Sequence, residues 1–193
     1  MVVYLRALSE PLRLAAGFSP TELFPLIPLG QIGPLFQLVK IEIAREAATI
    51  IMLGAIAAAA GTRWLPAFAL VFGVWDLTFY AALKILIDWP ASLFTWDLLF
   101  LLPVPWVGPV LAPSIVATSL VIGGIVGIVR PLKRSAFNTV LLTVGAMIII
   151  LGFTWDWRYV VNGGLPRSFP WTIFWLGEAL GIISLLRALR VSR

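Results

Sequence analysis

The sequence predicts an all-α, polytopic integral membrane protein, and three observations lead to this fold class. Of the 193 residues, 61% are hydrophobic and only 12% are charged, which is too little polar surface to cover a water-soluble globule of this size. The mean hydropathy is +1.01. Apolar runs of about 20 residues, the length that crosses roughly 30 Å of hydrocarbon as a helix, recur along nearly the whole chain. We therefore expect no separate soluble domain.

The chain divides into an N-terminal amphipathic, interfacial region (residues 1–35) and a membrane domain (residues 36–193). Leucines recur at helical spacing between residues 2 and 17 while charged residues interrupt them, which is typical of a helix lying in the headgroup layer. The prolines at 25, 28 and 34 then prevent a long helix. The N-terminus lacks the compact apolar region and cleavage site of a secretory signal, so we expect it to be retained.

The membrane domain contains about six predicted spans, of which five are regular. The regular spans are Ile41–Gly61, Trp64–Ile87, Pro109–Val129, Phe137–Trp155 and Trp171–Leu189. The third span is broken by prolines: Ala91–Leu102 supplies about 18 Å of helix before the sequence PVPWVGP, which forbids a regular helix. Extended residues after the half-helix would complete a crossing over residues 91–108.

Two topologies compete at this third span. If residues 91–108 cross the membrane, both termini share one side, and eleven Lys and Arg residues lie there against three on the other side. If the segment is a re-entrant loop, the count becomes seven against seven. The positive-inside rule expects the asymmetric distribution. It therefore favours a multi-pass protein of the plasma (inner) membrane with six spans and both termini in the cytoplasm.

The composition excludes several classes of function. The chain has no Cys and no His, which removes disulfides, thiolate catalysis, iron–sulfur ligation and the usual ligand of haem, zinc and copper. We predict no metal site, no cofactor and no catalytic residues. The net charge of +5 comes from basic residues beside the spans, a pattern that sets membrane orientation and does not indicate nucleic acid.

Five polar residues inside the predicted spans form a candidate buried polar cluster or ion path. They are Asp76, Asp97, Glu178, Arg45 and Glu46. Asp76 and Asp97 belong to two copies of the pattern Trp-Asp-Leu-x-Phe. At 1.5 Å per residue, Asp76 and Glu178 each lie about 18 Å from their span ends, near the bilayer midplane, whereas Asp97 lies only about 9 Å deep. We therefore expect Asp76 to lie across from Glu178 and to pair in that region. We expect Asp97 to lie near Arg45.

Two GxxxG patterns are candidate sites of close helix packing. They are formed by Gly123 and Gly127 and by Gly177 and Gly181, and this spacing lets helix backbones approach each other in membranes. The second pattern brackets Glu178 and would bring this acid against another helix.

These residues favour a non-enzymatic role, with two leading hypotheses. In the first, the protein is a small accessory or scaffold subunit of a larger membrane complex, and the acids brace its helices. In the second, it is a proton- or cation-coupled transport or permeation subunit, because staged acids beside a broken helix suit an ion path. The expected partners are the lipid bilayer and other membrane subunits or further copies of the chain.

Two enzymatic alternatives are weaker. A lipid-modifying enzyme would need carboxylates at the interface holding a divalent cation against a phosphate, but no DxxD pair or phosphate-binding basic cluster is present. An aspartyl protease would need two carboxylates within hydrogen-bonding distance, and the expected depths of Asp76 and Asp97 differ by about 9 Å.

Overall fold

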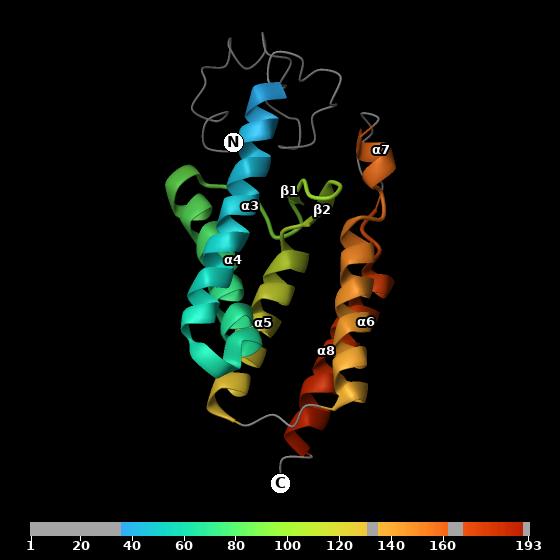
Figure 1. Ribbon diagram of the computed structural model, residues 1–193. Coiled ribbons are helices and arrows are strands. Elements are labelled where there is room, and N and C mark those ends of the chain that lie inside the picture. Colours follow the sequence, from blue (N-terminus) through green and yellow to red (C-terminus); the bar gives the residue numbers. More distant parts are fainter. Residues whose placement is uncertain (1–35, 131–134, 162–167, 191–193) are drawn as a thin grey trace.

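The computed structural model is a mainly helical body, and it describes residues 36–130, 135–161 and 168–190. Its long helices run roughly parallel to one axis (Figure 1). In chain order the elements are α3 (Phe36–Ala59), η3 (Gly61–Arg63), α4 (Trp64–Ile87), β1 (Trp96–Phe100), β2 (Trp106–Pro109), α5 (Leu111–Val129), α6 (Ala136–Phe153), α7 (Trp157–Val161) and α8 (Trp171–Arg190). The predicted interfacial region, residues 1–35, lies outside the described residues.

Four of these helices are long and apolar enough to cross a membrane: α4, α5, α8 and a span from Ala136 to Val160 that begins with α6. Helix α3 is as long as α4 but carries four charged residues in its first half. Large apolar side chains are exposed on the outer faces of the helices, for example Ile51, Ile85 and Met147, at 72%, 82% and 64% of their surface. Exposed faces of this kind suit hydrocarbon surroundings, which supports a membrane protein.

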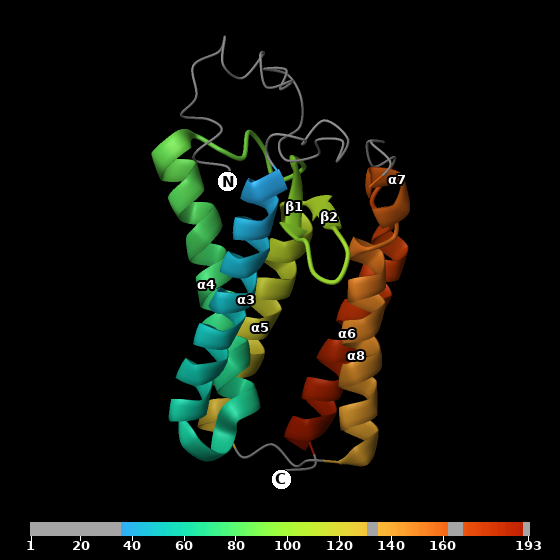
Figure 2. The ribbon, with the colours of Figure 1, turned by 45° about the horizontal axis from the view of Figure 1, so that its top comes forward.

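The long helices form two groups. Helices α3, α4 and α5 make one group and α6 and α8 the other, with a two-stranded hairpin between them at one end (Figures 1 and 2). Few helix contacts join the groups, mainly between α5 and α8, whereas β2 contacts both α5 and α6. The hairpin therefore connects the two groups at this end.

Glycines allow the closest helix contacts. A Cβ atom on Gly73 of α4 would lie 2.5 Å from the Ala117 carbonyl oxygen of α5. In the other group, a Cβ on Gly177 would lie 2.7 Å from the Gly145 carbonyl oxygen. Both pairs of helices thus pack backbone against backbone, as is common between helices in membranes.

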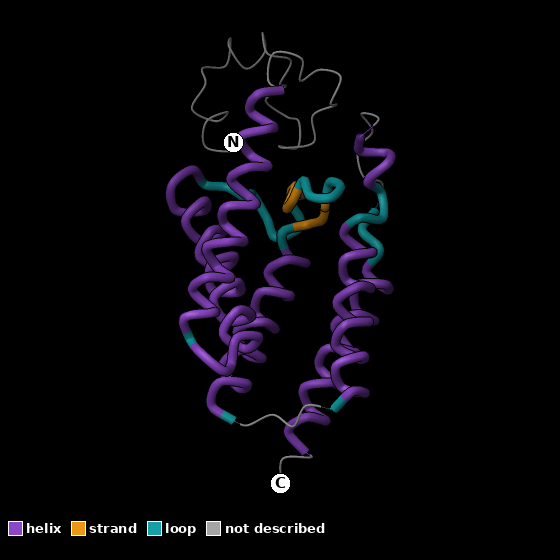
Figure 3. The backbone as a smooth tube through the Cα atoms, in the orientation of Figure 1, coloured by secondary structure: helices purple, strands orange, loops and turns teal. Residues whose placement is uncertain are grey.

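The predicted half-helix over Ala91–Leu102 was wrong. Residues 96–100 form strand β1, which pairs antiparallel with β2 in the register Trp96↔Pro109, Asp97↔Gly108 and Leu98↔Val107 (Figure 3). Of the prolines that were expected to break a span, Pro103 and Pro105 lie in the connection between the two strands, and Pro109 is the last residue of β2. Strand pairing satisfies the backbone N–H and C=O groups that a proline-rich segment cannot satisfy in a helix.

The hairpin does not cross the helical body. A five-residue strand is about 17 Å long, well short of the roughly 30 Å of a hydrocarbon core. Helix α4 ends and α5 begins at the same end of the molecule, beside the hairpin (Figure 1). Six crossings are therefore not present among the described helices, and the first described helix begins at the end opposite to the one where α8 finishes.

An aromatic core holds the hairpin against the second helix group. Phe153 and Phe174 are 3% and 0% exposed, and Phe153 lies 6.3 Å from Trp106 of β2 between ring centroids. A Cβ on Gly108 would lie 2.9 Å from the Phe153 ring, so only glycine fits there without movement. This packing fixes the position of the carboxylate on β1.

Candidate functional site

A cavity of about 1730 Å³ separates the two helix groups. Its lining comes from α3, α4, α5, α6, α8 and the hairpin, and most of these residues are apolar or aromatic. On α4 the lining extends from Trp64 to Leu83, nineteen residues or about 28 Å along the axis. The cavity therefore extends over most of the length of a membrane-spanning helix.

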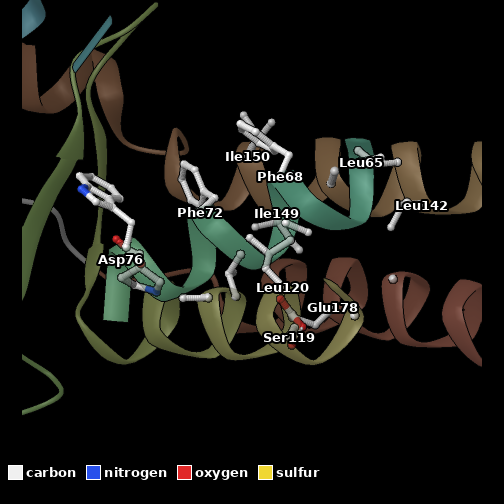
Figure 4. A pocket seen from close by; sticks show the side chains of 18 of the residues that line it. Leu65, Phe68, Phe72, Asp76, Ser119, Leu120, Leu142, Ile149, Ile150 and Glu178 are labelled. Atoms are coloured by element: carbon white, nitrogen blue, oxygen red, sulfur yellow. Dashed lines mark hydrogen bonds between the residues drawn. The ribbon is translucent and has the colours of Figure 1, made fainter. Parts of the chain in front are cut away.

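Asp76 lies in this cavity near the hairpin (Figure 4). Phe72 and Tyr80 are four residues before and after it, so all three side chains share one face of α4. The Asp76 side chain is partly buried and, within the part of the chain that the structure describes, receives no hydrogen bond and forms no ion pair. It is thus a carboxylate in apolar surroundings that opens onto the cavity.

Asp97 is buried against α4 instead of against Arg45. Its side chain is 5% exposed, and the Tyr80 hydroxyl donates a hydrogen bond of 2.8 Å to its Oδ2 atom. Burial raises the pKa of Asp97 to about 6, an effect that the hydrogen bonds from Tyr80 and from the Leu98 backbone partly oppose. The carboxylate therefore connects the hairpin to α4.

Glu178 forms a second connection, between α8 and α5. Its side chain is 4% exposed, and its Oε2 atom accepts a hydrogen bond of 2.9 Å from the Ser119 hydroxyl (Figure 4). Figure 4 shows Asp76 and Glu178 at different levels of the cavity, with Asp76 nearer the hairpin. The structure thus gives Glu178 a serine partner and does not bring the two acids together.

Glu46 and Arg45 have separate partners although they are adjacent in α3. The Leu101 backbone N–H donates to both carboxylate oxygens of Glu46, at 3.2 and 3.0 Å, and Glu46 is 6% exposed. Arg45 forms its ion pair with Glu42, one turn earlier in the same helix. Glu46 therefore holds the end of β1, while Arg45 neutralises a different acid.

Replacing Glu46 with alanine should loosen the hairpin without unfolding the helices. The substitution leaves the partly buried Leu101 N–H without its acceptor, and an unsatisfied donor of this kind costs up to about 3 kcal/mol. We expect the Leu101 amide to exchange with deuterium at least tenfold faster in the variant. Glu42→Ala is the matched control, because it removes an acid from the same helix that does not contact the hairpin backbone. Unchanged exchange at Leu101 would contradict this role of Glu46.

The four predicted packing glycines fall into different surroundings. Gly177 contacts Gly145 of α6, and Gly127 is buried in α5. A Cβ on Gly123 or Gly181 would meet no atom within 4 Å, so the structure shows no close contact at these two positions. The GxxxG spacing alone did not single out Gly73, Gly124 and Gly145, which do make close contacts.

Three site residues were not singled out from the sequence. Tyr80 had a signal, since it follows Asp76 by one helical turn. Ser119 had no such signal, because nothing in the sequence indicates that α5 and α8 are in contact. Trp106 has a buried indole nitrogen with no hydrogen-bond acceptor among the described residues, and its position depends on the unexpected hairpin.

The donor groups do not form a metal site in the described part of the chain, where no group of three or more Asp and Glu side chains is placed to hold an ion. Asp76 lies near Asp97, close enough for the two charges to repel each other, whereas Glu178 lies further along the cavity. Such an arrangement suits proton binding or a single positive charge rather than a multiply coordinated metal.

Comparison with protein-family models, with curated proteins and with solved structures found no match to this chain.

Proposed function

We propose that the protein is a small transport-related membrane subunit in which protons or a cationic solute occupy the cavity between the two helix groups. The observation that carries this proposal is Asp76, an acid without a protein partner among the described residues that faces an apolar-walled cavity. An ionised group in hydrocarbon costs at least about 2.5 kcal/mol. A proton or a bound cation removes that cost.

The length of the cavity supports movement as well as binding. Polar residues line it at several levels: Glu46 and Asp97 near the hairpin, Glu178 and Ser119 further along, and Arg63 and Arg130 at the far end. Acids at different depths beside irregular backbone are a feature of ion and proton paths in membrane proteins. Here the irregular backbone is the hairpin, which lines the cavity through Leu98 to Leu101.

A second candidate is the accessory or scaffold subunit of a larger membrane complex. Three carboxylates favour it, because Glu46, Asp97 and Glu178 each accept hydrogen bonds from another part of the fold and so brace it. Asp76 has no such bracing role in the described residues. This difference is why we place transport first and the accessory role second.

We propose five crossings, made by α3 and the four apolar helices, with the hairpin re-entrant from one side of the plasma membrane. This arrangement replaces the six-span expectation and distributes the basic residues seven against seven. The described helices then begin and end on opposite sides, in contrast to the expected cytoplasmic location of both termini. The plasma membrane supplies the ion gradient that a cation-linked function uses.

Replacing Asp76 with asparagine should abolish proton or cation movement in proteoliposomes. Asn has nearly the same shape as Asp but carries no charge and binds no proton at neutral pH. We expect pyranine-loaded vesicles with the wild type to acidify when an inward proton gradient is imposed, or a cation tracer to enter, and Asp76→Asn vesicles to show at least a tenfold slower rate.

The matched control is Asp88→Asn. Asp88 is an exposed acid at the C-terminus of α4 that pairs with Lys84 and lies outside the cavity, and its backbone has φ of 52°, a conformation that Asn also tolerates. This variant should transport like the wild type. Equal rates in wild type, Asp76→Asn and protein-free vesicles would reject the transport proposal and favour the accessory role.

A further inference from the structure

Aromatic rings surround the hairpin end of the cavity. Phe72, Trp75 and Phe79 follow one another along α4 with ring centroids 5.9 Å apart in each step. From the hairpin, Phe100 of β1 packs against Phe72 with ring centroids 6.3 Å apart, and Trp106 of β2 lies 5.5 Å from Phe100. All five rings belong to the lining of the cavity. The rings therefore come from α4 and from both strands of the hairpin, and they meet over about two turns of α4.

Asp76 lies within this stretch of α4. It follows Phe72 by four residues and precedes Tyr80 by four, and the hairpin covers both ends of this stretch through the Phe72–Phe100 and Tyr80–Asp97 contacts. Its carboxylate is the acid of this region without a protein hydrogen bond in the described residues, since Asp97 is occupied by Tyr80. An acid without a hydrogen-bond partner among the described residues thus lies between aromatic rings, and the neighbouring carboxylate of Asp97 adds negative charge to this region.

We propose that this end of the cavity binds an alkylated ammonium group, with Asp76 as the counter-ion and Phe72, Phe100 and Trp106 as aromatic walls. The inference rests on the proposed function and deepens it by naming the class of cation. Aromatic faces attract organic cations within about 6 Å of the ring, and the attraction is strongest where water is excluded.

The chemistry of the site distinguishes this ligand from other cations. A divalent metal ion takes six or more oxygen ligands, and the described residues offer no group of three acids here. A primary ammonium would need up to three hydrogen-bond acceptors, whereas a quaternary ammonium has no N–H group and needs only its counter-ion. The cavity of about 1730 Å³ exceeds the roughly 300–1,000 Å³ of ordinary ligand sites, so an apolar substituent on the ammonium also fits.

The test uses the purified full chain and a pair of ligands that differ only in charge. Choline is the cationic probe, and 3,3-dimethyl-1-butanol is its neutral isostere, with a carbon in place of the quaternary nitrogen. We expect choline to change the tryptophan fluorescence of the protein saturably, and the isostere to bind at least tenfold more weakly. Equal binding of the two, or no saturable choline signal, would overturn the proposal.

Substitutions test whether the fluorescence change comes from choline bound at this site. Asp76→Asn should weaken choline binding at least tenfold, and Phe100→Leu at least about threefold through the loss of one aromatic face. The matched controls are Asp88→Asn and Phe94→Leu, since neither residue lines the cavity and Phe94 is 66% exposed. Circular dichroism and melting temperature establish that each variant is folded. If neither Asp76→Asn nor Phe100→Leu weakens choline binding, choline binds elsewhere and the proposed site is rejected.

Two lipid compositions distinguish a soluble ligand from a lipid headgroup. In phosphatidylglycerol nanodiscs, choline should bind whether the natural ligand is a free solute or a lipid headgroup, because this lipid carries no ammonium group. In phosphatidylcholine nanodiscs, it should bind equally well if the ligand is a free solute and poorly if the lipid headgroup already occupies the site. The absence of choline binding in phosphatidylglycerol together with intact proton flux would reject the ammonium site alone. Binding without any flux would reject the transport proposal and leave the site in place.

Discussion

Replacing Gly73 with alanine is expected to destabilise the protein, although alanine is the better helix former. The new Cβ would lie 2.5 Å from the Ala117 carbonyl oxygen and 3.1 Å from the Val121 backbone nitrogen. Both neighbours are backbone atoms of α5, so α4 and α5 must separate to admit the methyl group. Overpacking of this kind typically costs about 1–3 kcal/mol, and we expect a clearly lower melting temperature in detergent.

The control for this prediction is Gly123→Ala, on α5. A Cβ at this position meets no atom within 4 Å, so the substitution retains only the gain in helix propensity, up to about 1 kcal/mol. Its melting temperature should equal or exceed that of the wild type. If both variants shift the melting temperature in the same direction, the close α4–α5 contact is not what stabilises this helix group.

The sequence predicted the regular helices well because each is a long apolar run with clear ends. The predicted span Trp64–Ile87 has the same bounds as α4, and the predicted span Trp171–Leu189 ends one residue before α8 does. Long runs of this kind have one stable solution in a membrane, since only a helix satisfies their backbone groups internally. The coarse fold class, a mainly helical membrane protein, follows from these runs alone.

The hairpin could not be predicted from the same reasoning. The run WDLLF is short and apolar, and periodicity does not separate a helix from a strand over so few residues. The distribution of basic residues then favoured a crossing, because it gave eleven against three. The count of basic residues depends only on which side of the membrane the segment ends lie. It contains no information about strand pairing, such as that between Trp96 and Pro109.

The partners of the acids were also beyond the sequence. Counting 1.5 Å per residue gives the depth of Asp76 and Glu178 but does not say which helices are neighbours. In the structure α8 packs mainly against α6 and meets α5 only at a few points, among them Ser119 and Glu178. The sequence could still predict that the acids lie inside the helical body, because ionised groups avoid lipid whichever helices are neighbours.

Removing the Tyr80 hydroxyl is the second change with a large expected effect. Tyr80→Phe deletes the donor to Asp97 while preserving the ring, and both residues are nearly buried, at 7% and 5% exposure. A hydrogen bond to a charged group contributes about 1.5–3 kcal/mol. We expect the variant to lose this amount at neutral pH, where Asp97 is ionised, and its melting temperature to fall accordingly.

The loss should depend on pH in a direction that the pKa of Asp97 determines. Burial raises this pKa from the ordinary 3.8 to about 6 in the folded protein. The folded state therefore binds the proton more tightly than the unfolded state, and the stability contributed by the neutral carboxyl is fully present below about pH 4 and lost as pH rises through about 6. Since the tyrosine hydrogen bond favours the ionised form, its removal should steepen this decline.

A double-mutant cycle with Asp97→Asn isolates the pair from other titrating groups, such as Asp76 and Glu46. Asp97→Asn should flatten the decline in stability between about pH 4 and pH 6, because asparagine does not titrate. Tyr80→Phe should then cost less in the Asp97→Asn background, where only a hydrogen bond between neutral groups is lost. Melting temperatures of the four proteins at pH 4 and pH 8 measure the cycle. If the Tyr80→Phe cost is the same at both pH values and in both backgrounds, the ionised state of Asp97 is not what the Tyr80 hydroxyl stabilises, and the carboxylate does not hold the hairpin to α4 in the way the structure indicates.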